Sequence, residues 1–376
     1  MKIPLNKIYI TGKELAYIKQ AIDNGKLSGN GYFTKLCRDV FQKKFGFKNT
    51  LLTSSCTDAL EMAAILLNIK SGDEVILPAY TFVSTANAFV LRGADVVFAD
   101  SKPDSPNMDC QSVEKLLSNR TKAIVCMHYA GLPCDLDALM NLSEKYHIPV
   151  VEDAAHALGS YYERKSLGTF GALAAFSFHD TKNITCGEGG LLVVNDERYW
   201  QRAEIIWEKG TNRAQFSRGE INKYEWMDIG SSFLPSEITA AFLYAQLEEF
   251  DNIQSRRISI WNTYYDRLKS LEEKGRFKLP TPTDKHSAHL FYLVCSSAEH
   301  RDQLKKHLNE RGIGATFHYV SLHASPFYLS HHPQPILLNS EKFFNGLLRL
   351  PIYPELSDED VRFVISSIYE FYNENS

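Results

Sequence analysis

Short apolar segments alternate with helical segments through the first half of the chain, and this alternation constrains the fold more than any other feature. The apolar segments lie at residues 74–77, 96–99, 123–127, 148–152, 173–178 and 190–194. Helical segments are expected at residues 57–69, 84–91, 112–117 and 136–146. Apolar strands separated by helices form parallel sheets that helices cover on both faces. The sequence therefore predicts an α/β domain.

The second half of the chain follows a different pattern. Helical signal dominates from residue 235 to about 271, and strands at 291–295 and 315–319 then mix with helices. Two helix starts have capping residues: Thr11 and Glu14 have the spacing of a capping box, and Ser357 with Asp360 occupies matching positions. We expect a large α/β domain over residues 1–250 and a smaller α+β domain over residues 251–376.

Composition and missing motifs exclude several classes of protein. The formal net charge of −4 gives no overall attraction to nucleic acid or to anionic membranes. The N-terminal residues are not expected to form a signal peptide, and the sequence contains no apolar run of about 18 residues. The seven cysteines form no C-x-x-C pair and do not cluster with histidine, which predicts reduced thiols, a cytoplasmic protein and no metal site. The glycine fingerprints of nicotinamide-cofactor and P-loop proteins, and the G-x-S-x-G of hydrolases, are absent.

Three polar features stand out, and two of them follow predicted strands, where open α/β sheets bind their ligands. Residues 53–60 are small and polar and lead into an apolar helix, whose N-terminus could bind phosphate or be an ordinary cap. The strand 148–152 ends in Glu152 and Asp153, and such a buried carboxylate needs a partner or braces the loop. The loop 177–190 carries Lys182, which as a single feature is most often an exposed lysine.

Together these features resemble the DegT/DnrJ/EryC1/StrS sugar aminotransferases, which are fold type I enzymes of pyridoxal 5′-phosphate (PLP). The ordered motifs are GDEV at 72–75, P-x-YTF at 78–82, HYAG at 128–131, EDAA at 152–155, SFH-x-x-KN at 177–183 and GEGG at 187–190, followed by LH at 322–323 and LP at 350–351. The resemblance covers nearly the whole chain. It implies a mostly parallel seven-stranded sheet in the large domain, and a homodimer with shared active sites.

The resemblance also implies a role for individual residues. Lys182 is the catalytic residue that bonds to the cofactor aldehyde and then moves the proton, and Asp153 pairs with the pyridine nitrogen. The remaining implied cofactor contacts are Cys56, Thr57, Asp58, Phe82, His156, Ser177 and, from the neighbouring subunit, Ser232. Two of these depart from the family pattern, because His156 stands where glutamine is common and Ser232 where asparagine is common.

The substrate is a separate inference. Residues 25–31 and 209–232 resemble family members that transfer the amino group of L-glutamate to C4 of a dTDP-linked 4-keto-6-deoxyhexose. Lys209 and Arg213 are then expected to bind the substrate diphosphate, although they could equally belong to a solvated basic loop, and His323 is a further expected substrate contact. A UDP-linked sugar, a 3-keto sugar and a PLP-dependent sugar dehydratase are the alternatives.

Overall fold

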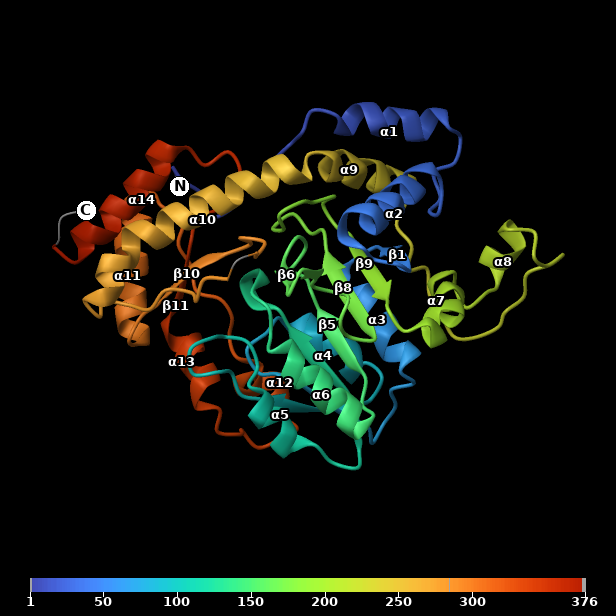
Figure 1. The fold of residues 1–376 in the computed structure, drawn as a ribbon, viewed down its shortest axis with the longest axis horizontal. Helices are drawn as coiled ribbons and strands as arrows, with labels where there is room; N and C mark the ends of the chain where they lie inside the picture. The colour runs from blue at the N-terminus through green and yellow to red at the C-terminus, as the bar shows by residue number, and fades with distance from the viewer. Residues whose placement is uncertain (1, 284, 374–376) are drawn as a thin grey trace.

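The structure, a computed structural model, describes residues 2–283 and 285–373. Its centre is a seven-stranded sheet with the strand order β1-β9-β8-β5-β4-β2-β3 (Figure 1). The strands are β1 Thr50–Thr53, β2 Glu74–Pro78, β3 Asp95–Ala99, β4 Thr121–Met127, β5 Val150–Asp153, β8 Leu173–Ser177 and β9 Gly190–Val194. Strand β9 runs antiparallel to both of its neighbours, and the other pairs are parallel. The predicted α/β fold with a mostly parallel sheet is confirmed.

Helices cover both faces of this sheet (Figure 1). The α-helices of the described residues are α1 Glu14–Asp23, α2 Tyr32–Phe45, α3 Cys56–Leu66, α4 Val83–Val90, α5 Cys110–Leu116, α6 Leu136–Tyr146, α7 Trp200–Trp207, α8 Arg213–Ser217, α9 Glu237–Glu248, α10 Phe250–Glu273, α11 Ala298–Glu310, α12 Pro326–Leu329, α13 Leu338–Gly346 and α14 Asp358–Phe371. The helices predicted between residues 57 and 146 all form, with ends shifted by a few residues at most. Strand β1 and helix α2 were not predicted.

Alternating side chains along the strands divide the core between the two faces. In β9, Leu192 and Val194 belong to a cluster that includes residues of α3, α4 and α7. Leu191 and Val193 point the other way and pack with residues of α2 and α9. Further along the sheet, α5 and α6 pack against buried side chains of β2, β4 and β5. This two-sided burial is why the strands are apolar at nearly every position.

A second core lies at the other end of the molecule. Helices α10, α11 and α14 pack there with the antiparallel strands β10 (Phe291–Val294) and β11 (Leu347–Leu350). The strand predicted at 315–319 is wrong: this segment forms one bridge, between Thr316 and Arg349, and otherwise runs as a loop. After the bridge, the segment continues to His318 and Tyr319, which line a cavity.

We propose a domain boundary near residue 250, at the start of α10. Phe250 and Ile253 of this helix pack with the sheet core, whereas Ile260 and Leu271 pack in the second core. The division of the chain at this point is not strict, because Ile3 from the N-terminal segment also lies in the second core.

The two predicted helix starts differ in outcome. The Ser357 hydroxyl accepts a hydrogen bond from the Asp360 N–H at 3.0 Å and caps α14, as predicted. At α1, the Glu14 carboxylate accepts from the Thr11 N–H at 2.8 Å, but the Thr11 hydroxyl accepts from Lys13, so only half of the capping box forms. No helix within residues 2–283 and 285–373 is both long and apolar enough to cross a membrane.

Candidate active site

A cavity of about 610 Å³ lies where the parallel strands end and the second core begins. Its wall contains most of the residues predicted to bind a cofactor. These are Cys56, Thr57, Phe82, Asp153, His156, Ser177 and Lys182. They come from four separate segments of the chain, and the sheet brings them together because the carboxyl ends of parallel strands meet at one edge.

The N-terminus of α3 forms one end of the cavity. Cys56 and Thr57 open this helix, and the first N–H groups of a helix have no acceptor within it. Asp58 differs from its prediction, because its N–H donates to the Ser55 hydroxyl at 3.0 Å and the residue does not line the cavity. Gly190 lies against this turn: a Cβ there would come within 2.4 Å of the Ser55 backbone. The turn is therefore a compact group of donors suited to a phosphate.

Asp153 and Glu152 end β5 but point to different environments. Asp153 lines the cavity, and its carboxylate accepts from the Thr85 hydroxyl at 2.6 Å and the Ala155 N–H at 3.1 Å. Burial raises the pKa of the Asp153 carboxyl because it disfavours the charged form. A cationic partner in the cavity would stabilise the carboxylate. Glu152 is fully buried, and accepts from the His128 ring and from N–H groups of the loop 168–171. Only Asp153 is therefore available to a ligand.

Lys182 lies in the loop between β8 and β9, half-buried in the cavity wall. Burial lowers the pKa of its amine, and the charge of Asp153 opposes that shift. A lowered pKa increases the fraction of free amine, which is the nucleophilic form. The next residue anchors the loop: the Asn183 side chain donates to the Ser287 carbonyl at 2.6 Å and accepts from the His289 ring at 2.9 Å.

His156 presents a neutral ring to the cavity. Its Nδ1 accepts from the Ala130 N–H at 3.3 Å, so Nε2 carries the hydrogen, and Nε2 lies 3.4 Å from the Tyr319 hydroxyl. Burial lowers the pKa of this imidazole well below its usual range, and the nearby Lys182 charge lowers it further. The ring is thus a hydrogen-bond donor at Nε2, which suits the predicted partner of a cofactor hydroxyl.

Phe82 and Ser177 complete the predicted set. The Phe82 side chain is 52% exposed and lies at the cavity wall, 5.8 Å from the Tyr319 ring centroid, so one ring face is free to stack. Ser177 ends β8, and its hydroxyl accepts from the His179 N–H at 3.4 Å. Both side chains remain accessible from the cavity.

The other predicted residues lie elsewhere. Ser232, Lys209 and Arg213 line a second cavity of about 590 Å³, which also contains residues of the segment 26–30. His323 is a correction: it is fully buried, and its ring is hydrogen-bonded to Ser321 at 2.9 Å. It supports the turn behind the cavity and cannot touch a substrate without unpacking that turn.

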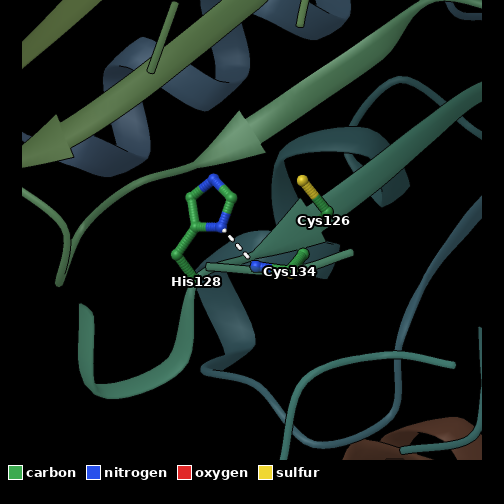
Figure 2. A group of neighbouring side chains, drawn as sticks. All are labelled: Cys126, His128 and Cys134. Atoms are coloured by element: carbon green, nitrogen blue, oxygen red, sulfur yellow. Dashed lines mark hydrogen bonds between the residues drawn. The ribbon is translucent and has the colours of Figure 1, made fainter. Parts of the chain in front are cut away.

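The expectation that cysteine and histidine do not cluster is wrong, because Cys126, His128 and Cys134 offer ligating atoms within 4.8 Å of one another (Figure 2). The His128 ring and the Cys134 thiol are already hydrogen-bonded. His128 Nδ1 accepts from the Cys134 N–H at 3.2 Å and Nε2 faces Glu152 at 3.0 Å, while the Cys134 thiol donates to the Met127 carbonyl at 3.2 Å. We assign this group a structural role, holding the turn after β4.

Sequence reasoning missed the side chains that the second core contributes to the cavity. These are His289, His318, Tyr319 and Arg349. No strand-end rule points to them, because they follow no parallel strand. The only sequence feature that could have indicated a role for this part of the chain was the resemblance of the neighbouring residues 322–323 and 350–351 to the family.

The fold and the cavity define a PLP-dependent transferase of fold type I. The donor set fits this cofactor, with an acid at a strand end, a lysine in the next loop and a helix N-terminus beside Gly190. The roles of individual residues at the cofactor stay predictions.

Comparison with known proteins agrees with this class. A profile of the DegT/DnrJ/EryC1/StrS aminotransferase family matches residues 9–369. GDP-perosamine synthase of Escherichia coli O157:H7 is 32% identical over 378 residues, which cover 99% of this chain and 99% of that protein. The structure of DesV from S. venezuelae, solved in complex with a ketimine intermediate, has 30% identity and a TM-score of 0.90 over 100% of both chains. Helicobacter pylori PseC, an aminotransferase of pseudoaminic acid biosynthesis, has 26% identity and a TM-score of 0.90 over 99% of this chain and 100% of that one.

The chain belongs to the DegT/DnrJ/EryC1/StrS aminotransferase family. It is an aminotransferase, and its cofactor is PLP. The recognition of this sugar aminotransferase family from sequence motifs is therefore confirmed.

Proposed function

We propose that this enzyme transfers the amino group of L-glutamate to C4 of dTDP-4-dehydro-6-deoxy-glucose. The product would be dTDP-4-amino-4,6-dideoxygalactose, a precursor of surface polysaccharides such as lipopolysaccharide or enterobacterial common antigen. One observation carries the reaction type: Lys182 and Asp153 line the same cavity at the carboxyl ends of the strands. The substrate rests on the resemblance of residues 25–31 and 209–232 to the transaminase of the enterobacterial-common-antigen type.

Different residues of the cavity would have different roles in the reaction. PLP, when bound, supplies an aldehyde and an electron-accepting ring. The N-terminus of α3 would hold its phosphate, and Asp153 would keep its ring nitrogen protonated. Lys182 would hold the aldehyde carbon and later carry the proton removed from the amino acid.

We propose a homodimer in which the second cavity serves the neighbouring active site. Lys209, Arg213 and Ser232 lie together in that cavity, apart from Lys182 in the same chain. Next to it the chain exposes large apolar side chains, including Trp226 at 82% exposure. Exposed apolar groups of this size favour a subunit contact. The cations would then bind the diphosphate of a substrate whose sugar lies at the partner's Lys182.

A GDP-linked or UDP-linked keto-sugar is the second candidate. The relative named GDP-perosamine synthase matches nearly the whole chain, so that class of substrate deserves direct comparison. A 3-keto sugar is a further alternative. A PLP-dependent dehydratase is disfavoured because enzymes of that kind replace the lysine with histidine, and Lys182 is present. We propose a cytoplasmic location, in keeping with seven cysteines that are all free thiols.

The test is a panel of dTDP-, GDP- and UDP-linked keto-sugars with L-glutamate, with the product configuration read by NMR. We expect the dTDP-linked 4-keto-6-deoxy sugar to be preferred and its product to carry an axial amine. Preference for a GDP-linked, UDP-linked or 3-keto sugar would contradict the substrate assignment and leave the aminotransferase assignment in place.

A further inference from the structure

Arg349 brings an unpartnered cation to the wall of the active-site cavity. It lies on β11, in the part of the chain that sequence reasoning did not connect to the site. Its Nε is buried and has no hydrogen-bond partner. Among the described residues, none forms an ion pair or a hydrogen bond with this guanidinium. The residue as a whole is half-buried, and a desolvated charge without a partner is costly, so such a group favours an anion as its partner.

The other groups in the cavity do not neutralise this charge. The phenols whose charge would act on Arg349 are Tyr129, Tyr319 and Tyr80, and burial raises the pKa of all three, which keeps them neutral. Asp153 already accepts two hydrogen bonds and would face the cofactor ring. Glu188 is exposed and lies 3.6 Å from the ring of His179.

The neighbouring imidazoles add no positive charge. Burial lowers the pKa of His156, His289 and His318 well below the usual histidine range. The described wall of the cavity therefore holds two strong cations, Lys182 and Arg349. Lys182 is committed to the cofactor aldehyde in the proposed reaction. Arg349 therefore remains available to bind a second anionic group. That group would lie close to the reacting amine, because the charge of Arg349 also acts on Lys182.

We propose that Arg349 binds a carboxylate of the amino-acid donor and so orients the amino group toward the cofactor. This inference rests on the proposed transamination. The planar guanidinium forms two parallel hydrogen bonds with a carboxylate, a geometry that a lysine cannot reproduce. The competing anion is the diphosphate of the sugar nucleotide, which shares the chemistry but lies beyond the sugar ring from the reacting carbon.

The experiment compares Arg349→Met and Arg349→Lys with the wild-type holoenzyme. The matched control is Arg301→Met. Arg301 is a poorly exposed arginine on α11, and its guanidinium donates to the Phe344 carbonyl at 2.9 Å. It does not line the cavity. Binding of glutarate, a dicarboxylate that cannot react, is measured by calorimetry. The two half-reactions are followed separately by the colour of the bound cofactor, which also reports whether each variant retains it.

We expect Arg349→Met to weaken glutarate binding and to lower kcat/KM for L-glutamate by about 10- to 100-fold. Arg349→Lys should recover only part of this loss, and Arg301→Met should change neither quantity. The sugar half-reaction, started from the aminated cofactor, should stay within about threefold.

Unchanged glutarate binding in Arg349→Met would overturn the inference, as would an equal loss of both half-reactions. A loss confined to the sugar half-reaction would assign Arg349 to the diphosphate and equally overturn it. If the wild-type enzyme holds its cofactor but never converts L-glutamate, the proposed function itself is wrong, irrespective of Arg349.

Discussion

Burial sets the chemistry of the single residues in this active site. The Lys182 amine and the Asp153 carboxyl are both moved toward their neutral forms by desolvation, and each opposes the shift of the other. In the proposed roles, a bound cofactor would replace this mutual interaction, since it would offer Lys182 a covalent bond and Asp153 a cationic nitrogen. The pKa values of Lys182 and Asp153 are thus already shifted in the protein without its cofactor.

Lys182→Ala should abolish transamination while the fold persists. One amine performs both the covalent step and the proton transfer, so we expect a loss of at least about 10⁴-fold in turnover. Activity is measured with both substrates, and the unfolding temperature checks the fold. Lys122→Ala, an exposed lysine on β4, is the control. A cofactor link that borohydride still reduces in Lys182→Ala would contradict the assignment.

Asp153→Asn should weaken cofactor retention and slow the proton shift. A neutral amide removes the roughly 1–3 pKa units by which a carboxylate supports a protonated partner. We expect turnover to fall by at least about tenfold, with faster loss of visible absorption during dialysis. Native turnover in the purified variant would refute the role of Asp153.

The lowered pKa of Lys182 predicts a pH dependence for cofactor capture by the apoprotein. Only the unprotonated amine attacks an aldehyde, so the rate should rise with pH and level off above the pKa of this lysine. Because burial lowers that pKa, the midpoint should lie below the ordinary value of 10.5. Stopped-flow absorption gives the profile, and a midpoint at or above 10.5 would show that Lys182 is not desolvated.

At the scale of the secondary-structure elements, the conformation of the turn at the N-terminus of α3 depends on Gly190, the first residue of β9, which lies directly against it. Gly190→Ala would place a methyl group within 2.4 Å of the Ser55 backbone, so the turn must move. We expect cofactor affinity to fall about tenfold or more, as judged by titration of the apoprotein, since several N–H groups shift together. The control is Gly187→Ala, whose Cβ meets nothing within 4 Å. That control should lower stability through its positive φ without changing cofactor affinity.

Sequence patterns located the elements and site residues that depend on neighbours in the chain. Asp153 and Lys182 could be found because each follows a strand, and strand ends share one edge of the sheet. Strand β1 was missed because it is four residues long with threonine at both ends, too short for a periodic signal. Arg349 and His318 could not be found, since their place in the cavity depends on packing between segments that are far apart in the chain.

On the scale of the whole molecule, a shared active site predicts that two defective proteins can restore each other. Arg213→Ala should mainly impair the sugar half-reaction, because remote binding of the diphosphate orients the sugar. If Arg213 acts on the partner's substrate, mixing this variant with Lys182→Ala creates hybrid dimers with one intact site.

Random exchange of subunits should then recover about one quarter of the wild-type activity, which is measured after the mixture has been incubated long enough to equilibrate. Each variant incubated alone is the control. No recovery despite proven exchange would place Arg213 and Lys182 in the same site. A fully active monomer in sedimentation at the assay concentration would refute the dimer.

The helix α10 has a mechanical consequence. One continuous helix of 24 residues anchors its first turn in the core of the sheet and the rest in the second core. A continuous helix resists bending. A hinge motion that separates the sheet core from the second core, the two lobes of the molecule, would therefore have to break backbone hydrogen bonds of α10. The cavity between the two lobes would then keep a nearly constant size while, in the proposed reaction, an amino acid and a nucleotide sugar enter it in turn. We expect alternation of substrates to be governed by loops and by the partner subunit, and the scattering profile to be the same with either substrate bound.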